Sequence, residues 1–312
     1  MKELSFPHYR KNQIKLYHKL GGGAVGTVFK GHLKYRGETV DCVIKRIQSS
    51  DYKDGSDSLE FYRDILDEIN IGSRFMGKTK YQIHFYGYAY DIQDGVVNLY
   101  LLMEHTRGND LQIYLQNEKH WTQLSKQEYL QSKSLTKLCH QGNYWDYIPS
   151  THHKLRIITY LVQAVRELHS YNVVHCDLKP NNMLYLGSKI KLIDYDISVV
   201  VTSEDHEGAS DMGTNGYMAP ETKDGWIHKK GDIYSLGVTM LEIWFGDIWC
   251  HDTKDDELLR SYVDNYLELL RLDFPPLYTI IEQCVRLDRD ERPSTEQTYQ
   301  AIQTLYQSGS YS

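Results

Sequence analysis

The sequence predicts an α+β protein of two lobes, with a β-rich first third and a mostly helical remainder. Short runs of strand composition, separated by glycine, occupy much of residues 15–103, whereas apolar residues at three- and four-residue steps recur after residue 110. The polar, turn-like segment 105–109 lies between these regions and is a candidate hinge. Because strands come first and helices second, we expect two parts of different secondary structure joined by a short connector.

Each element can be placed in chain order. In the first third we expect a five-stranded antiparallel sheet and one helix, with strands at 15–20, 27–34, 39–47, 83–91 and 96–103 and the helix at 59–75. In the remainder we expect a hairpin of 183–185 with 190–193 and helices at 155–168, 233–244, 257–272 and 278–285. The polar, aromatic-rich segment 116–150 fits no assignment.

Composition excludes several classes of protein. The chain has 312 residues and a net charge of −7, which disfavours a nucleic-acid binder that depends on phosphate contacts. None of the five cysteines lies in a C-x-x-C pair, so we expect a reduced, intracellular and cytoplasmic protein. No apolar stretch follows Met1, and the longest apolar run, 236–249, contains Glu242 and Asp247. We therefore expect neither a signal peptide nor a membrane span.

The glycines Gly21, Gly23 and Gly26 form a G-x-G-x-x-G pattern, and Val28 follows two residues later. Glycine lets the backbone approach a phosphate closely because no β carbon intervenes. The pattern alone also fits a plain glycine-rich turn or a dinucleotide site, but a dinucleotide site needs a helix directly after the glycines. Here a strand-like run follows, which favours a loop that covers a nucleotide.

Lys45 ends an apolar strand 19 residues after Gly26. Lysines in this position usually extend to the surface. A hairpin would instead bring Lys45 under the glycine loop, where its ammonium group could hold phosphates.

Residues 175–182 read His-Cys-Asp-Leu-Lys-Pro-Asn-Asn, and a second acid, Asp194, follows Asp177 by 17 residues at the end of an apolar run. The intervening hairpin brings Asp177, Asn182 and Asp194 towards one place. Carboxylate and amide oxygens suit Mg²⁺, and a remaining aspartate could accept a proton from a hydroxyl group. Surface acids beside a turn would not explain this spacing.

With these motifs the sequence resembles the eukaryotic-type protein kinases over residues 15 to about 300. Residues 218–221 read Met-Ala-Pro-Glu and match the family's A-P-E segment. Asp232 matches the start of the helix that follows, and Arg292 matches a late arginine that pairs with the A-P-E glutamate. Several motifs in the family's order and approximate spacing make chance an inadequate explanation.

The resemblance implies an ATP site and a two-lobed protein-kinase fold. Gly21, Gly23 and Gly26 would cover the phosphates, Val28 would pack on adenine, and Lys45 would hold the α- and β-phosphates. The remaining residues implied at this site are Glu68 as partner of Lys45, Met103 as gatekeeper, Glu104 and Thr106 with backbone groups for adenine, Asp110 for ribose, and Val43 and Leu184 as further lining residues.

The resemblance also implies the catalytic roles. Asp177 would orient and deprotonate the substrate hydroxyl, and Lys179 would neutralise the transferring phosphoryl group. Asn182 and Asp194 would hold Mg²⁺. Lys179 within D-L-K-P-x-N, and Thr214 within G-T-x-x-Y, resemble the serine/threonine type.

Several positions depart from the family pattern. Cys176 replaces the arginine before the catalytic aspartate, as in non-RD kinases, and Asp196 replaces the glycine after the metal-binding aspartate. Val43 replaces a smaller alanine. Gly72 stands where a packing side chain is usual, which leaves either a hole or Glu60 as the true partner of Lys45.

We therefore expect an N-terminal extension at 1–14 and a kinase domain at 15–308, with an N-lobe at 15–103, a hinge at 104–110 and a C-lobe at 111–308. The expected function is transfer of the ATP γ-phosphate to serine or threonine of protein substrates, with Mg²⁺ as cofactor. A regulatory partner is left open. The alternatives are a pseudokinase or scaffold that binds nucleotide or a partner without efficient catalysis, and a small-molecule kinase.

Overall fold

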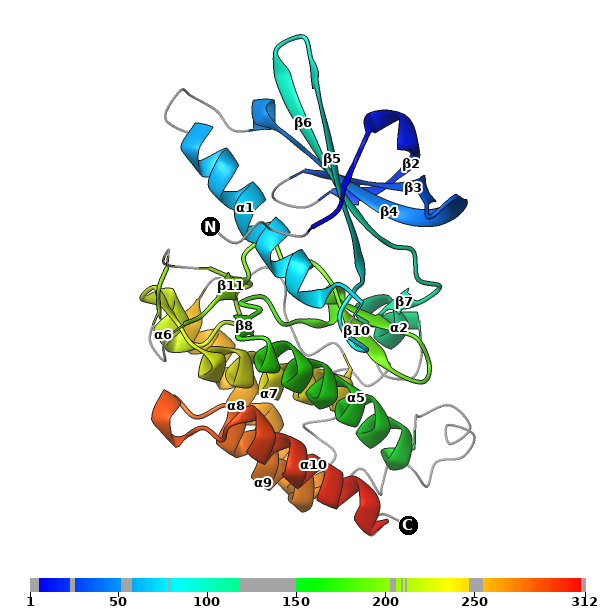
Figure 1. Ribbon diagram of the computed structural model, residues 1–312. Coiled ribbons are helices and arrows are strands. Elements are labelled where there is room, and N and C mark those ends of the chain that lie inside the picture. Colours follow the sequence, from blue (N-terminus) through cyan, green and yellow to red (C-terminus); the bar gives the residue numbers. More distant parts are fainter. Residues whose placement is uncertain are drawn as a thin grey trace. The chain divides into compact units, whose positions relative to one another are not determined.

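The chain folds into two compact units (Figure 1). The computed structural model describes residues 6–22, 26–51, 58–77, 79–117, 150–202, 206–208, 210, 212–246 and 255–309. The N-terminal unit comprises residues 1–107 and 194–200, and the C-terminal unit comprises residues 108–193 and 201–312. Gly23 and most of the unassigned segment, 118–149, lie outside the described residues.

The described part of the N-terminal unit contains a sheet and a long helix. The sheet has six strands in the order β1-β5-β6-β4-β3-β2. Its strands are β1 (His8–Tyr9), β2 (Ile14–Gly22), β3 (Thr27–Tyr35), β4 (Glu38–Gln48), β5 (Phe85–Gln93) and β6 (Val96–Glu104). The helix is α1 (Ser58–Phe75), and β11 (Val199–Val200) lies near the end of this unit. The five predicted strands and the predicted helix are present.

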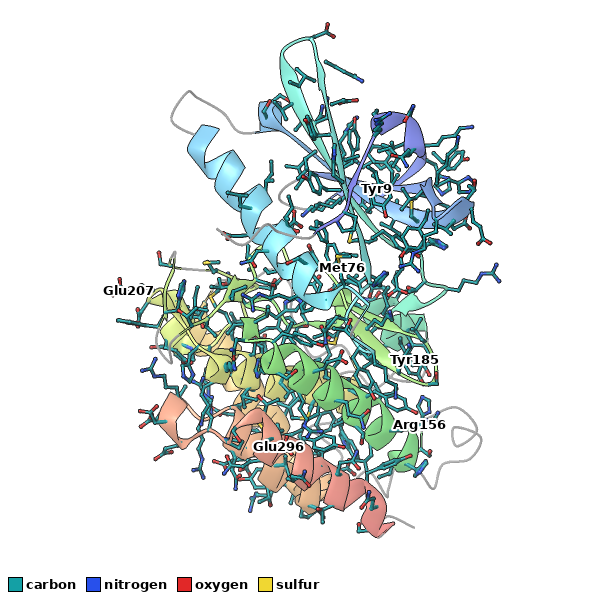
Figure 2. All side chains as sticks on the ribbon, viewed as in Figure 1. Tyr9, Met76, Arg156, Tyr185, Glu207 and Glu296 are labelled. Carbon is teal, nitrogen blue, oxygen red and sulfur yellow. The ribbon has the colours of Figure 1, made fainter. Side chains whose placement is uncertain are left out.

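The sheet differs from the prediction in its sixth strand, β1. This strand runs parallel to β5, with His8 opposite Tyr88 and Tyr9 opposite Ala89. Two residues are too few to produce an alternating pattern, which explains why the sequence did not reveal the strand. Tyr9 packs against the apolar core of the sheet (Figure 2). His8 and Tyr9, which fall within the expected N-terminal extension, therefore form an edge strand of the sheet.

One face of the sheet carries its apolar core. Leu33, Cys42, Ile44 and Leu102 are fully buried in this cluster, together with Ile14, Ala89 and Tyr100. Successive side chains of a strand point to opposite faces. Positions 43 and 45 of β4 therefore lie on the other face, which is the face relevant to the predicted site.

Gly72 in α1 leaves no hole. A β carbon at this position would lie 2.8 Å from a ring atom of Phe85 and 3.1 Å from Phe6. The two aromatic side chains fill the space that a larger residue would occupy. The glycine at this position is therefore explained by packing and does not argue against Glu68 as the partner of Lys45.

The C-terminal unit is mostly helical and contains short strands. Within the described residues its helices are α2 (Leu111–Asn117), α5 (Thr151–Ser170), α6 (Pro220–Lys223), α7 (Lys229–Phe245), α8 (Asp256–Asp273), α9 (Pro275–Cys284) and α10 (Thr295–Ser308). Its strands are β7 (Asn109–Asp110), β8 (Val173–Val174), β9 (Met183–Tyr185), β10 (Ile190–Leu192), β12 (His206–Glu207) and β13 (Trp226–Ile227). The predicted hairpin is present as β9 and β10, and β7 adds a third strand.

Helices α5 and α7 form the centre of this unit, and α10 packs along α5 (Figure 1). Every residue of α7 from Gly231 to Trp244 is buried. The guanidinium group of Arg292 makes two bonds to Glu221, of 2.6 and 2.9 Å, and its side chain is completely buried. A bidentate pair of this kind fixes geometry as well as charge. Among the described residues, no helix is both long and apolar enough to cross a membrane.

Candidate functional site

In the N-terminal unit, strand register places several predicted ATP-site residues on one face of the sheet. Val28 lies opposite Lys45, and Val43 lies opposite Met103. Directly paired residues of antiparallel strands project to the same side, and Val43 and Lys45 are two residues apart on one strand. Val28, Val43 and Met103 are only partly buried, so this face is apolar and accessible around Lys45.

The glycine loop connects β2 to β3 at one end of this face. Gly21 lies opposite Val28, and no atom lies within 4 Å of the place that a β carbon would take there. Gly26 has a φ of +86°, and a β carbon at this position would lie 2.5 Å from the carbonyl oxygen of Arg46. Glycine is therefore required at Gly26 for both conformation and close approach.

Lys45 is buried and binds two carboxylates. Its Nζ lies 2.7 Å from Oε1 of Glu68, and it also bonds to Oδ1 of Asp196. Burial by itself lowers the pKa of Lys45, but the charges of Glu68 and Asp196 outweigh burial and hold the pKa above its ordinary value. We call Lys45, Glu68 and Asp196 the Lys45 triad. The side chain of Glu60 lies outside the described residues.

The pKa of Glu68 is raised to about 8, mainly because this carboxyl group is buried. The Lys45 ammonium opposes the rise, and the Asp196 carboxylate adds to it.

Asp194, two residues before Asp196, is exposed and has a φ of +64°. Aspartate tolerates this left-handed conformation better than most residues do.

The predicted adenine residues follow β6. The backbone N–H of Glu104 donates to the carbonyl oxygen of His84 at 2.8 Å, so the amide of Glu104 is already used within the unit. The hydroxyl oxygen of Thr106 is buried and has no hydrogen-bond partner among the described residues. The predicted contact of Thr106 with adenine concerns its backbone groups, which this buried hydroxyl does not test.

In the C-terminal unit, Asp177 lies at the centre of a hydrogen-bonded cluster. Its Oδ2 lies 2.7 Å from Nζ of Lys179 and accepts from Nδ2 of Asn182 at 2.8 Å. Its Oδ1 accepts from the hydroxyl of Thr214 at 2.6 Å, and Lys179 donates to that hydroxyl at 2.5 Å. The structure therefore gathers four of the predicted residues: Asp177, Lys179, Asn182 and Thr214.

These contacts keep Asp177 ionised. Burial would raise its pKa, but hydrogen bonds from Lys179 and Thr214 and the charge of Lys179 outweigh burial and hold the pKa below its usual value. A carboxylate that remains deprotonated can accept a proton from a hydroxyl group nearby.

Asp232 anchors the segment that carries Asp177. Its carboxylate accepts backbone N–H groups of His175 at 2.8 Å and Cys176 at 3.0 Å, and it contacts the ring of His169 at 2.9 Å. Cys176 has a φ of +66°, a strained conformation for a residue other than glycine. The sequence identified Asp232 as a motif residue but gave no sign of this role, because its partners lie more than 50 positions away.

Asn182 presents an oxygen that suits a hard cation. Both donor contacts of its amide nitrogen, at 2.8 Å, go to Asp177. The amide oxygen is thus the atom of Asn182 that can act as a metal ligand. Among the described residues, no group of three or more His, Cys, Asp or Glu side chains forms a metal cluster. Mg²⁺ usually needs only one or two protein ligands together with substrate phosphates, so the predicted pair Asn182 and Asp194 does not require such a cluster.

Asp110 and Leu184 are neighbours in the C-terminal unit, where they pair across β7 and β9. Oδ1 of Asp110 accepts the backbone N–H groups of Gln112 at 2.7 Å and Ile113 at 3.3 Å at the start of α2. Asp110 therefore caps a helix through one of its two carboxylate oxygens.

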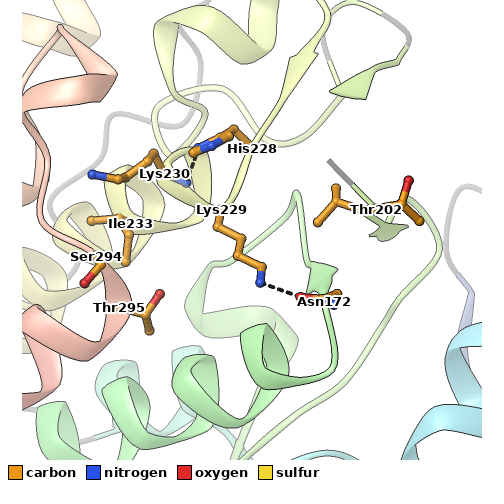
Figure 3. A pocket seen from close by; sticks show the side chains of 9 residues that line it. Asn172, Thr202, His228, Lys229, Lys230, Ile233, Ser294 and Thr295 are labelled. Carbon is orange, nitrogen blue, oxygen red and sulfur yellow. Dashed lines mark hydrogen bonds between the residues drawn. The ribbon is translucent and has the colours of Figure 1, made fainter. Parts of the chain in front are cut away.

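A separate cavity of about 430 Å³ lies at the start of α7 and α10 (Figure 3). Lys229 points across it and donates to the carbonyl oxygen of His169 and to Oδ1 of Asn172, both at 2.8 Å. Lys230 donates to the carbonyl oxygen of Arg292. The cationic side chains that line this cavity thus satisfy backbone carbonyl groups of the fold, and none of the predicted site residues lines it.

Comparison with known proteins decides the family. A family model described as the protein kinase domain matches residues 14–303. The chain belongs to the protein kinase family. The resemblance drawn from the motifs is thereby confirmed, as is the fold of a β-rich part followed by a helical part.

Individual kinases are only distant relatives. The MAP kinase kinase MKK1/SSP32 of Saccharomyces cerevisiae is 26% identical over 92% of this chain and 52% of its own length. Calcium-dependent protein kinase 5 of Plasmodium berghei is 26% identical over 89% of this chain and 44% of its own. A membrane-associated tyrosine- and threonine-specific cdc2-inhibitory kinase, wee-1.3 of Caenorhabditis briggsae, is 29% identical over 44% of this chain and 21% of its own. The chain spans about half or less of the length of these curated relatives.

Proposed function

We propose that this protein kinase family member transfers the γ-phosphate of ATP to serine or threonine hydroxyl groups of protein substrates, with Mg²⁺ as cofactor. The observation that carries the proposal is the cluster around Asp177, in which an ionised carboxylate is held by Lys179, Asn182 and Thr214. Phosphoryl transfer depends mainly on positioning and charge neutralisation, and this cluster offers both.

Each residue has a distinct task in the proposed reaction. Asp177 orients the substrate hydroxyl and accepts its proton. Lys179, whose ammonium lies beside that carboxylate, stabilises the negative charge that develops on the transferring group. Asn182 and Asp194 are the residues proposed to hold Mg²⁺, which neutralises phosphate charge when bound. Lys45, oriented by Glu68, holds the nucleotide phosphates.

Serine/threonine specificity is supported by the neighbourhood of Thr214. Its hydroxyl lies between Lys179 and Asp177, next to the place proposed for the substrate hydroxyl. Lys179 and the G-T-x-x-Y stretch resemble the serine/threonine type. Because wee-1.3 is named for both tyrosine and threonine, membership of the family alone does not define the acceptor.

The second candidate is a pseudokinase that acts as a scaffold. One observation favours it: Lys45, which would anchor phosphates, already binds Asp196 as well as Glu68. The intact Asp177 cluster favours the enzyme.

The deciding experiment is a transfer assay with radiolabelled Mg·ATP and generic protein substrates, followed by identification of the phosphorylated amino acids. We expect phosphoserine or phosphothreonine from the unaltered protein and none from Asp177→Asn. Phosphotyrosine as the main product would overturn the acceptor assignment. Absence of transfer to the protein itself and to every substrate would favour the scaffold.

A further inference from the structure

Asp196 occupies the position at which most of the family has glycine, and its side chain reaches Lys45. The contact joins residues 151 positions apart, and both lie in the N-terminal unit. The side chains of Lys45, Glu68 and Asp196 are 7%, 9% and 13% exposed, so water screens their charges poorly.

Neighbouring contacts hold Asp196 in this place. The hydroxyl of Tyr195 donates to Oε1 of Gln82 at 2.9 Å, and the Tyr195 ring packs against Phe75 with a centroid separation of 5.1 Å. The backbone N–H of Ser198 donates to the carbonyl oxygen of Tyr195 at 3.0 Å. Asp196 itself is not among the residues with positive φ, so the absence of glycine here causes no backbone strain of that kind.

The two acidic side chains of the Lys45 triad share one ammonium group, and burial raises the pKa of Glu68, which favours its neutral form. A nucleotide phosphate that binds Lys45 must compete with Asp196 for the same N–H donors. Glu68 also contacts Lys45, but the family resemblance implies that contact as part of the nucleotide-binding arrangement. The resemblance implies no contact between Lys45 and residue 196.

We propose that Asp196 is a positioning residue that holds Lys45 in the nucleotide-free protein and must be displaced by the nucleotide phosphates. Asp196 thereby weakens nucleotide binding. The inference rests on the proposed function for its assignment of Lys45 to the phosphates. A purely structural role of Asp196 would change stability alone, and a role as an additional metal ligand would strengthen metal-dependent binding.

The test measures affinity for ADP by isothermal titration calorimetry, with and without Mg²⁺, in Asp196→Ala and Asp196→Asn. We expect Asp196→Ala to bind ADP about tenfold more tightly or better in both conditions, which is the effect of removing one competing hydrogen bond to a charged group. Asp196→Asn retains the shape and should give a smaller gain. The matched control is Asp41→Asn, which removes one exposed carboxylate of the same unit and should change affinity less than about twofold.

The same variants separate this proposal from the proposed function. Asp196→Ala should lower the KM for ATP and leave the KM for the protein substrate unchanged.

Tighter ADP binding without any phosphate transfer would refute the proposed function and support the role of Asp196. Normal transfer with unchanged or weaker ADP binding in both variants would overturn the role of Asp196, as would failure of all forms of the protein to bind ADP. Weaker binding only with Mg²⁺ present would also overturn it, because that result identifies a metal ligand. If Asp196→Ala does not fold, Asp196→Asn decides by the same criteria.

Discussion

At the scale of single residues, the two charged centres of this protein differ in how their charges are balanced. Asp177 is surrounded by donors from Lys179, Asn182 and Thr214, which stabilise its ionised form. Lys45 is surrounded by two acceptors. Substitutions at the two centres should therefore have different consequences for stability and for activity.

Two substitutions of Thr214 distinguish the effect of its hydroxyl from the effect of the rest of the side chain. Thr214→Val removes the donor to Asp177 and the acceptor for Lys179 while nearly preserving volume. We expect the transfer rate to fall about tenfold, whereas Thr214→Ser should retain most of it. The hydroxyl lowers the pKa of Asp177, so its loss raises that pKa, and the acidic limb of the pH–rate profile should move to higher pH. Rates measured from the lowest pH at which the protein stays folded up to pH 8 test this, and equal profiles for both variants would count against it.

Replacing Lys45 should cost stability as well as activity. Lys45→Met leaves the two buried acids Glu68 and Asp196 without a cation. We expect transfer to be almost abolished and the free energy of unfolding to fall by about 3 kcal/mol. Lys45→Arg keeps the cation and serves as the control for stability. Denaturant unfolding of both variants provides the measurement, and a Met variant as stable as the Arg variant would show that the triad is not an electrostatic unit.

At the scale of elements, α1 depends on a close approach to β5. Gly72 faces Phe85 and Phe6, and these two aromatic rings also contact each other. The sequence predicted none of these contacts. The helix and the two aromatic residues are consequently packed without room for another carbon atom.

Gly72→Ala tests this packing. Alanine favours a helix over glycine by about 1 kcal/mol, whereas overpacking a core costs about 1–3 kcal/mol. Because the β carbon would lie 2.8 Å from the buried Phe85 ring, we expect the free energy of unfolding to fall by about 1 kcal/mol. Gly21→Ala, where no atom lies within 4 Å of the added carbon, is the control and should change stability little. A stabilised Gly72→Ala variant would contradict the prediction.

At the scale of the whole molecule, the segment between Asp196 and Met218 bears on regulation. A phosphate on such a segment usually orders it by pairing with arginine. Cys176 stands at the position of the family's arginine, and there is no arginine or lysine between residues 196 and 218. Glu204, Asp205, Glu207 and Asp211 would repel an added phosphate, although of these only Glu207 lies among the described residues.

Activity should therefore not require phosphorylation of this segment. We expect phosphatase-treated and untreated protein to transfer phosphate at rates within about twofold. Alanine variants of Ser198, Thr202, Ser203 and Ser210 are the controls and should behave alike. A large loss on dephosphorylation that one of these variants reproduces would contradict the prediction. Thr214 is excluded because its loss would act on Asp177 directly.

The sequence by itself predicted the family, five strands of the N-terminal sheet with helix α1, the β9–β10 hairpin and helices α5, α7, α8 and α9, and it supplied the candidate site residues. Motifs such as residues 175–182 are informative because neighbours in sequence stay neighbours in space. The same locality made the β4 strand and the β9–β10 hairpin predictable, since alternation and a turn glycine are local signals.

Only the tertiary structure decided which distant groups meet. Lys45 and Asp196 are separated by 151 positions and Asp232 and Cys176 by 56, and no local pattern relates them. Strand β1 adds two residues to a sheet edge through backbone bonds that are independent of side-chain pattern. Phe85 and Phe6 fill the space at Gly72 that the family pattern left unexplained. Such contacts depend on how the whole chain packs. A buried charge needs a partner and a buried space must be filled, but the fold decides which distant residue meets that need.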